Sequence, residues 1–328
     1  MQCRPAKKSC KECNNQIKMK ILCVCLSSTL QRAINFEDVK LAEVNRSKNY
    51  IQDASGKAVN SARVLNQLEK GCVKFLCTAG RDNSKEFEAL AKNDGLDYEL
   101  VKIPGKIREC WTLIDQKNGT TTEIVVGEPS VNGYDYSRAE KKLLARVKSL
   151  SKKVDGVLLA GSRPSFFNEE LCAQIARLVA LEGKLFMADY FGRDLQKTLD
   201  VCTPEIIKIN SEEFVKTFVN ESFVPDGSCL EEWKALDLQK QISIVSERLG
   251  NTVVVTRGKD STYAAKCGFF YECPVEKITP VNTTACGDSF SAGFLYEFLT
   301  SGSIKESLQK GTWCAARNAE RVRTGDVE

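Results

Sequence analysis

The sequence predicts an α/β fold with a doubly wound, mainly parallel sheet flanked by helices, and two observations support this. After Pro129, short apolar runs alternate with amphipathic stretches, which is the pattern of repeated strand–helix units. Earlier, two β-rich stretches, about 29–56 and 98–127, have no helices to cover them. We therefore expect them to meet as a small separate sheet, a lid beyond the carboxyl ends of the main strands.

The individual elements follow from apolar periodicity and from the residues that end helices and turns. Residues 21–26 are short, apolar and rich in β-formers, and the helical pattern after Asn60 ends at Gly71. The strands expected are 21–26, 73–78, 98–103, 109–115, 121–126, 157–160, 184–188, 206–209 and 253–256, with a hairpin over 262–274. The helices expected are 60–70, 84–93, 137–151, 168–182, 211–218, 230–249, 288–301 and 304–320. Residues 1–18 are basic and polar and are expected to form a disordered extension before a single domain at 19–328.

Composition excludes several kinds of site. The chain of 328 residues contains no histidine, so it has no Ser-His-Asp triad, no Cys-His dyad and no HExxH zinc site. Any acid–base catalyst must be Asp, Glu, Lys, Tyr or Cys. The net charge of +4, from 47 basic and 43 acidic residues, is too even to favour nucleic acid or a membrane surface as partner. No run approaches the ~20 apolar residues of a membrane span.

The cysteines indicate a reducing compartment. There are 15, an odd number, and many lie inside apolar runs, as small core residues of a cytoplasmic protein do. Cys10 and Cys13 form a lone CxxC without a second pair at zinc-finger spacing, which does not favour a metal site.

The stretch 282–288, Asn-Thr-Thr-Ala-Cys-Gly-Asp, leads from a turn of small residues into an amphipathic run. We expect a helix whose first turn holds Asp288. A helix N-terminus offers unpaired N–H groups and roughly half a positive charge, so this turn is suited to an anion. A carboxylate beside it can take a proton from an attacking hydroxyl. The alternative is that Asp288 only caps its helix.

This stretch resembles the signature Asp-Thr-x-Gly-Ala-Gly-Asp of the ribokinase-like (PfkB) carbohydrate kinases, with Asn282, Ala285 and Cys286 replacing the family's Asp, Gly and Ala. The resemblance covers about residues 19–326. It implies that Asp288 is the catalytic base and that Ala285, Cys286 and Gly287 form the anion hole. It also implies a ribokinase-like fold with a β-lid, and it allows a homodimer through that lid.

A second group of motifs concerns the substrate. Residues 53–60, Asp-Ala-Ser-Gly-Lys-Ala-Val-Asn, resemble the family's Gly-Gly-Lys-Gly-x-Asn, with Ser55 and Ala58 in place of glycines. Gln31 takes the place of an Asp that holds sugar hydroxyls in many relatives, and it can still hydrogen-bond a hydroxyl without the charge. The substrate-binding residues that the resemblance implies are Gln31, Gly56, Lys57, Asn60, Arg108, Ser162 and Arg163. We expect the cations Lys57, Arg108 and Arg163 to meet a phosphate on the substrate.

A third group concerns the nucleotide. Asn210 and Glu213 match the family's Asn-x-x-Glu, which implies ATP at Asn210 and Mg²⁺ at Glu213, commonly through water. A capping box is the alternative for the same two residues. The other ATP-binding residues implied are Thr256, Gly258, Ala315 and Asn318.

Together these motifs indicate an ATP-dependent kinase of a ketohexose phosphate, either fructose or tagatose phosphate. Arg108-Glu109-Cys110 followed by Thr122-Glu123-Ile124, together with Val44-Asn45-Arg46, favours the branch with phosphofructokinase B, 1-phosphofructokinase and tagatose-6-phosphate kinase. A kinase of an unphosphorylated sugar or nucleoside remains an alternative, and so does a non-catalytic sugar or nucleotide sensor on this fold. A Rossmann dehydrogenase is disfavoured because no GxGxxG follows the first strand.

Overall fold

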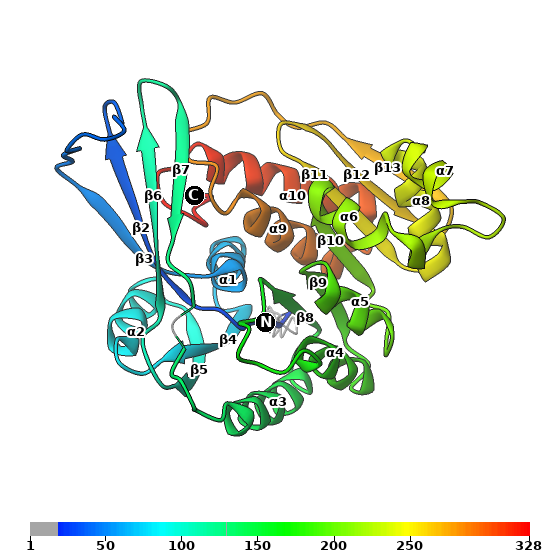
Figure 1. The fold of residues 1–328 in the computed structure, drawn as a ribbon, viewed down its shortest axis with the longest axis horizontal. Coiled ribbons are helices and arrows are strands. Elements are labelled where there is room, and N and C mark those ends of the chain that lie inside the picture. The colour runs from blue at the N-terminus through cyan, green and yellow to red at the C-terminus, as the bar shows by residue number, and fades with distance from the viewer. Residues whose placement is uncertain (1–18, 129) are drawn as a thin grey trace, which may run out of the picture.

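The central element is a large sheet with helices on both faces (Figure 1). The computed structural model describes residues 19–128 and 130–328, and within these ranges the sheet has nine strands in the order β13-β12-β11-β10-β9-β8-β1-β4-β5. The strands from β11 to β5 are parallel, whereas β12 and β13 are antiparallel. Their bounds are β1 (Ile21–Cys25), β4 (Val73–Gly80), β5 (Asp97–Ile103), β8 (Gly156–Ala160), β9 (Leu185–Asp189), β10 (Ile206–Asn210), β11 (Thr252–Arg257), β12 (Asp260–Lys266) and β13 (Phe269–Cys273). The predicted doubly wound fold is confirmed.

Strand β1 shows why its residues form a buried central strand. All five side chains are at most 1% exposed, and they alternate between two hydrophobic cores, one on each face of the sheet. One core contains α1 (Lys57–Leu68), α2 (Ser84–Asn93), α9 (Cys286–Ser301) and α10 (Ile304–Ala319). The other contains α3 (Ser137–Ser151), α4 (Leu171–Leu181), α5 (Arg193–Leu199), α6 (Ser211–Phe218), α7 (Leu230–Ala235) and α8 (Leu238–Leu249).

The strand order indicates the edge of the large sheet at which a ligand is expected. From β1 the chain passes to β4 and β5 on one side, and it later enters β8, β9, β10 and β11 on the other. The direction of winding therefore reverses between β1 and β8. In open α/β sheets, ligands bind beyond the carboxyl ends of the strands at such a reversal.

The expected small sheet is present, and its order is β3-β2-β6-β7. It contains β2 (Thr29–Phe36), β3 (Tyr50–Ser55), β6 (Arg108–Asp115) and β7 (Thr120–Val125). Strands β2 and β6, which come from the two separate β-rich stretches, pair in parallel at its centre. We call this sheet the lid.

Two sequence predictions differ from the structure, and one helix was missed. Residues 98–103 are expected in the lid, but β5 pairs in parallel with β4 at the edge of the large sheet, because alternation identifies a strand without fixing its partner. The expected helix 230–249 is two helices, α7 and α8, since the Asp237 side chain accepts a hydrogen bond from the amide of Lys240 and starts a new helix. Helix α5 was not predicted.

The described cysteines, from Cys23 to Cys314, are free thiols and most are buried, as expected for small core residues. Cys10 and Cys13, with the rest of the predicted extension 1–18, lie outside the described residues. Among the residues that are described, no helix combines the length and the apolar character that crossing a membrane requires.

Close packing of α9 on α10 generates a stability prediction. A Cβ at Gly293 would lie 2.7 Å from both the Sγ of Cys314 and the carbonyl oxygen of Lys310. Gly293→Ala should therefore lower the free energy of unfolding by about 1–3 kcal/mol, despite the better helix propensity of alanine. Denaturant unfolding measures this. The matched control is Gly127→Ala, where a Cβ meets nothing within 4 Å and no loss is expected. Equal stability of the two variants would contradict the packing argument.

Candidate active site

Asp288 lies in the first turn of α9, as the sequence predicts, and its side chain is buried. The helix begins two residues earlier than expected, at Cys286, because Ala285 adopts the left-handed conformation with φ 64° and ends the turn. An alanine in this region costs about 1–2 kcal/mol, so the turn keeps its shape at some expense of stability. The first-turn amides of Gly287 and Asp288 have no intrahelical acceptor and are available to an anion.

Two buried asparagines support this turn from behind. The Asn318 amide donates to the carbonyl of Thr284 (2.8 Å), while its oxygen accepts from the hydroxyl of Ser289 (3.2 Å) and the amide of Gly325 (2.6 Å). The Asn282 oxygen accepts from the amide of Thr284 (3.0 Å). Asn318 was predicted to bind ATP, and the structure gives it this supporting role, which the sequence did not suggest. Its contact with a nucleotide, like that of Ala315 on the same helix, stays a prediction.

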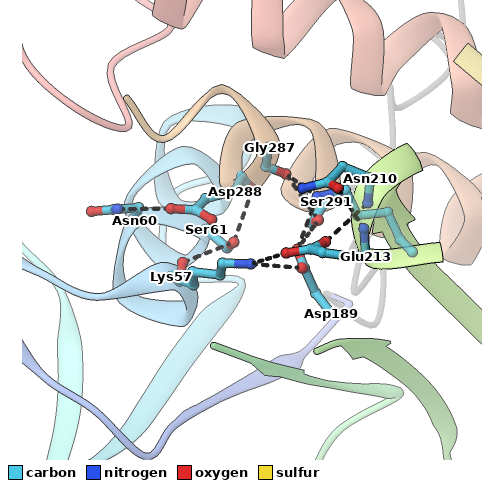
Figure 2. A network of polar contacts seen from close by, with 10 residues as sticks. Lys57, Asn60, Ser61, Asp189, Asn210, Glu213, Gly287, Asp288 and Ser291 are labelled. Atoms are coloured by element: carbon cyan, nitrogen blue, oxygen red, sulfur yellow. Dashed lines mark hydrogen bonds and ion pairs between the residues drawn. The ribbon is translucent and has the colours of Figure 1, made fainter. Parts of the chain in front are cut away.

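The carboxylate of Asp288 meets helix α1 (Figure 2). The Asn60 amide donates to the Oδ2 of Asp288 (2.8 Å), and the Ser61 hydroxyl donates to its carbonyl oxygen (2.9 Å). Helix α1 begins after Gly56, which has a φ of 123° and at which a Cβ would lie 2.8 Å from the carbonyl oxygen of Ser27, so only glycine fits there. Burial raises the pKa of Asp288 to about 6, although Lys57 acts in the opposite direction.

Lys57 extends from the first turn of α1 between two carboxylates. Its Nζ lies 3.5 Å from the Oδ1 of Asp189 and 3.5 Å from the Oε1 of Glu213. Asp189 is the largest of the causes that raise the pKa of Lys57, so the lysine is charged. The structure thus brings the predicted residues Lys57, Asn60, Glu213 and Asp288 together (Figure 2).

Sequence reasoning missed three residues at the centre of this cluster, Asp189, Lys208 and Ser291. The Nζ of buried Lys208 lies 3.1 Å from the Oδ2 of Asp189 and donates to the carbonyl of Gly287 (3.1 Å). Ser291 donates to Asp189 at 2.6 Å. Burial raises the pKa of Asp189, but Lys208 and Lys57 outweigh it and hold the pKa below its ordinary value. The signal that could have found two of them is a charged residue inside or at the end of an apolar strand, Lys208 in Ile-Ile-Lys-Ile-Asn and Asp189 in Leu-Phe-Met-Ala-Asp.

Asn210 and Glu213 form the capping box that the sequence left open. The Asn210 oxygen accepts from the amide of Glu213 (2.9 Å), and the Glu213 carboxylate accepts from the amide of Asn210 (2.9 Å). The second carboxylate oxygen of Glu213 faces Lys57, so an oxygen ligand is present on the site side. Within residues 19–128 and 130–328, no group of three or more acidic or thiol side chains could hold a metal by itself. Such a donor set fits Mg²⁺ held through water and phosphate oxygens rather than in a protein cage. The metal role stays a prediction.

The remaining nucleotide-side predictions cluster at neighbouring strand ends. Thr256 pairs in register with Asn210, at the carboxyl ends of β11 and β10. Gly258, with φ 63°, follows in the turn to β12. Their position next to Asn210 agrees with a shared role, which itself stays a prediction.

Of the remaining residues predicted to bind substrate, Gln31 and Arg108 lie on lid strands and Ser162 lies in a loop beside Lys57. Gln31 is buried and donates to the hydroxyl of Thr112 (2.5 Å), and Arg108 donates to Thr29 (2.8 Å) and lies 3.5 Å from Glu128. A Cβ on Gly161, next to Ser162, would lie 3.5 Å from the Cβ of Lys57, so that loop borders the site.

Arg163 is not brought into the cluster. Its guanidinium donates to Asp194 (2.9 Å) and to the carbonyl of Phe167 (2.6 Å), so in this conformation it braces its own loop.

The raised pKa of Asp288 generates a pH-dependent stability prediction. Between pH 3.8 and about 6 the folded protein keeps a proton that the unfolded chain releases, so stability falls as the pH rises through this window. Asp288→Asn should therefore stabilise the fold by up to about 3 kcal/mol at pH 8, with the gain shrinking toward pH 4. Denaturant unfolding at both pH values measures this, with exposed Asp200→Asn as the control. If Asp288→Asn is no more stable than wild type at pH 8, ionised Asp288 does not destabilise the fold and the prediction is wrong.

Comparisons with known proteins identify the family. Residues 20–327 match the pfkB family carbohydrate kinases. The chain is 26% identical over 313 residues to a tagatose-6-phosphate kinase of Staphylococcus epidermidis, covering 94% of each chain. Its fold is similar to a possible 1-phosphofructokinase of Thermotoga maritima (TM-score 0.79, 22% identity, 93% of each chain). It is also similar to phosphofructokinase-2 of Escherichia coli (TM-score 0.79, 17% identity, 93% of this chain and 94% of that one). The chain therefore belongs to the pfkB family of carbohydrate kinases and is a phosphotransferase with an alcohol group as acceptor.

Proposed function

We propose that this kinase transfers the γ-phosphoryl group of ATP to a hydroxyl of a ketohexose phosphate, with Asp288 as the catalytic base. The observation that carries the proposal is the geometry of Asp288: a buried carboxylate beside the N-terminus of α9, held by Asn60 at 2.8 Å. A pKa of about 6 leaves most of this carboxylate ionised at neutral pH, where it can still accept a proton.

The proposed step is an in-line displacement. Asp288 takes the proton of the attacking hydroxyl, the hydroxyl oxygen forms a bond to the γ-phosphorus, and the bond from that phosphorus to the ADP oxygen breaks. The first-turn amides of Gly287 and Asp288 stabilise the negative charge on the transferring group. Of the predicted anion-hole residues, Cys286 instead donates its amide to the carbonyl of Thr283 (3.3 Å). Mg²⁺, when bound near Glu213 and Asn210, would neutralise charge on the ATP phosphates. Thr256, Gly258, Ala315 and Asn318 are proposed to lie along the nucleotide.

The predicted cations Lys57 and Arg108 and the relatives support a phosphate already present on the substrate. The tagatose-6-phosphate kinase of S. epidermidis is named for such a substrate. Arg108, at the start of β6 in the lid, is only partly buried, and the acidic side chain that it pairs with is 3.5 Å away, so it is able to meet a dianion. Gln31 leaves the sugar pocket without the negative charge of an aspartate. Arg163 is omitted from the proposed site because its guanidinium is occupied within the protein.

Assembly and location are part of the same proposal. Apolar side chains on the lid are exposed, including Tyr50, Ile124 and Val125. A homodimer through the lid would cover them, and abundant free cysteines fit a cytoplasmic enzyme. A kinase of an unphosphorylated sugar or nucleoside is the main alternative. A non-catalytic sensor would give no reason for the raised pKa of Asp288.

The base assignment predicts the effect of Asp288→Asn on turnover. Removing a positioned base should lower kcat by roughly 10²–10⁴-fold, with the KM for ATP little changed. Steady-state kinetics with fructose 6-phosphate, fructose 1-phosphate and tagatose 6-phosphate measure this. Asp200→Asn removes the same charge from an exposed site and should leave kcat unchanged. Near wild-type turnover of the Asp288 variant would remove Asp288 from the mechanism.

The substrate assignment predicts the effect of Arg108→Ala. A charge-assisted contact is worth about 1.5–3 kcal/mol, so its loss should raise the KM for the preferred sugar phosphate at least tenfold. The KM for ATP should change little, and exposed Arg138→Ala serves as the control. If unphosphorylated fructose or ribose has the higher kcat/KM in the wild type, the phosphorylated substrate is wrong and the alternative kinase takes its place.

A further inference from the structure

The side chain of Asn60 is held from both sides inside the protein. Its oxygen accepts from the hydroxyl of Ser55 (2.9 Å) and from the guanidinium of Arg63 (3.3 Å), while its amide nitrogen donates to Asp288 (2.8 Å). Ser55, Asn60 and Arg63 are each less than 5% exposed, so water does not compete for these bonds. A continuous line of hydrogen bonds therefore runs from Ser55 to the carboxylate of Asp288.

Arg63 fixes which end of the Asn60 amide faces Asp288. Turning the amide over would point its NH₂ group at Arg63, which has only donors, and its oxygen at an ionised carboxylate. Both contacts would be repulsive. Arg63 thus selects the orientation in which Asn60 stabilises the charged form of Asp288. The Ser55 hydroxyl, which can donate or accept, adds a second hydrogen bond to the Asn60 oxygen in that orientation.

These two residues differ in what holds them. Arg63 is anchored outside the lid by Asp94 (2.9 Å) and by the carbonyl of Thr324 (2.9 Å), and it also donates to the carbonyl of Ala54 (2.5 Å) on β3. Ser55 is the last residue of β3 and pairs in register with Thr29 of β2. The Ser55 hydroxyl is therefore a contact between the lid and the line of hydrogen bonds that ends at Asp288. The family motif that residues 53–60 resemble has a glycine at the position of Ser55. A glycine has no hydroxyl and could not make this contact.

We propose that Ser55 is a positioning residue, which together with Arg63 orients Asn60 toward Asp288 and so couples the end of the lid strand to the ionisation of the base. This inference rests on the proposed function, in which Asp288 is that base. The other charged or titratable groups that act on Asp288 are Lys57 from α1, Asp189 from β9, Lys208 from β10 and, on its own helix, Cys286. None of them bonds to Ser55 in the described residues, so a change at Ser55 reaches Asp288 through Asn60.

The test is Ser55→Ala, read by two independent measurements. The first is the titration midpoint of the Asp288 carboxyl carbon, followed by ¹³C NMR in the free protein and assigned by its absence in Asp288→Asn. The second is the pH dependence of kcat/KM. Without the Ser55 hydroxyl the Asn60 oxygen is held by Arg63 alone, so the hydrogen bond from Asn60 to the carboxylate is less well aligned, which should raise the midpoint by about half to one pH unit. The acid limb of the profile should move by the same amount, lowering kcat/KM about 3–10-fold below the midpoint and less than about twofold at pH 8.5.

The matched control is Ser246→Ala. Ser246 is as buried as Ser55 and its hydroxyl donates to the carbonyls of Asn251 (2.7 Å) and Ala265 (2.9 Å), away from the site. It should lose stability without shifting either measurement. Ser55→Gly removes the same hydroxyl and replaces Ser55→Ala if that variant does not fold.

The outcomes separate this inference from the proposed function. An unchanged midpoint and an unchanged acid limb in both Ser55 variants would overturn the positioning role, whatever Asp288→Asn does to turnover. A raised midpoint with full turnover in Asp288→Asn would support the contact from Ser55 and overturn the base assignment instead.

Discussion

The candidate site depends on two buried carboxylates, Asp189 and Asp288, that share the positive charge of two lysines. An unpaired charge inside a protein costs several kcal/mol, so Asp189 is stable only because Lys208 and Lys57 lie within 3.5 Å of it. The same pairing gives the two acids opposite pKa shifts. Asp189 has the lysines at contact distance and its pKa is lowered, whereas burial raises the pKa of Asp288 to about 6. When two neighbouring carboxylates have environments that shift their pKa values in opposite directions, one is commonly a structural anion and the other a proton acceptor.

The same charges join elements that are distant in sequence. Lys57 comes from α1, Asp189 from β9 and the carbonyl of Gly287 from α9 (Figure 2). Lys208, from β10, bonds to both Asp189 and Gly287. A second set of ion pairs ties the lid to the body, because Arg323, near the C-terminus, donates to Asp53 on β3 and also pairs with Asp94 after α2. Arg63 pairs with Asp94 as well and contacts Asn60. The position of the lid strand and the surroundings of Asp288 are therefore parts of one polar network.

The backbone of the turn before α9 accommodates the departures from the family signature. Ala285, which replaces a glycine of the signature, adopts a φ of 64° as N-cap of α9. The helix therefore begins at Cys286 and has Asp288 in its first turn. The direction of the first-turn amides depends on the backbone shape, which hydrogen bonds from Asn318 and Asn282 hold, and not on the side chains at 285 and 286. At Ser55 the departure adds a group, since its hydroxyl bonds to Asn60.

The sequence alone determined the alternation of strands and helices, the two stretches that form most of the lid, and the position of Asp288, because apolar period and small-residue turns are local signals. Motifs whose spacing a fold family constrains also pointed to Lys57, Asn60 and Glu213, whose side chains the structure brings into contact with Asp288 or with one another. Only the tertiary structure decided that β5 joins the large sheet and that Arg163 turns toward Asp194. It alone found Asp189, Lys208 and Ser291, which are far apart in sequence and meet where parallel strands end beside a helix N-terminus. Strand pairing and buried charge compensation are long-range interactions, and no local pattern of residues specifies them.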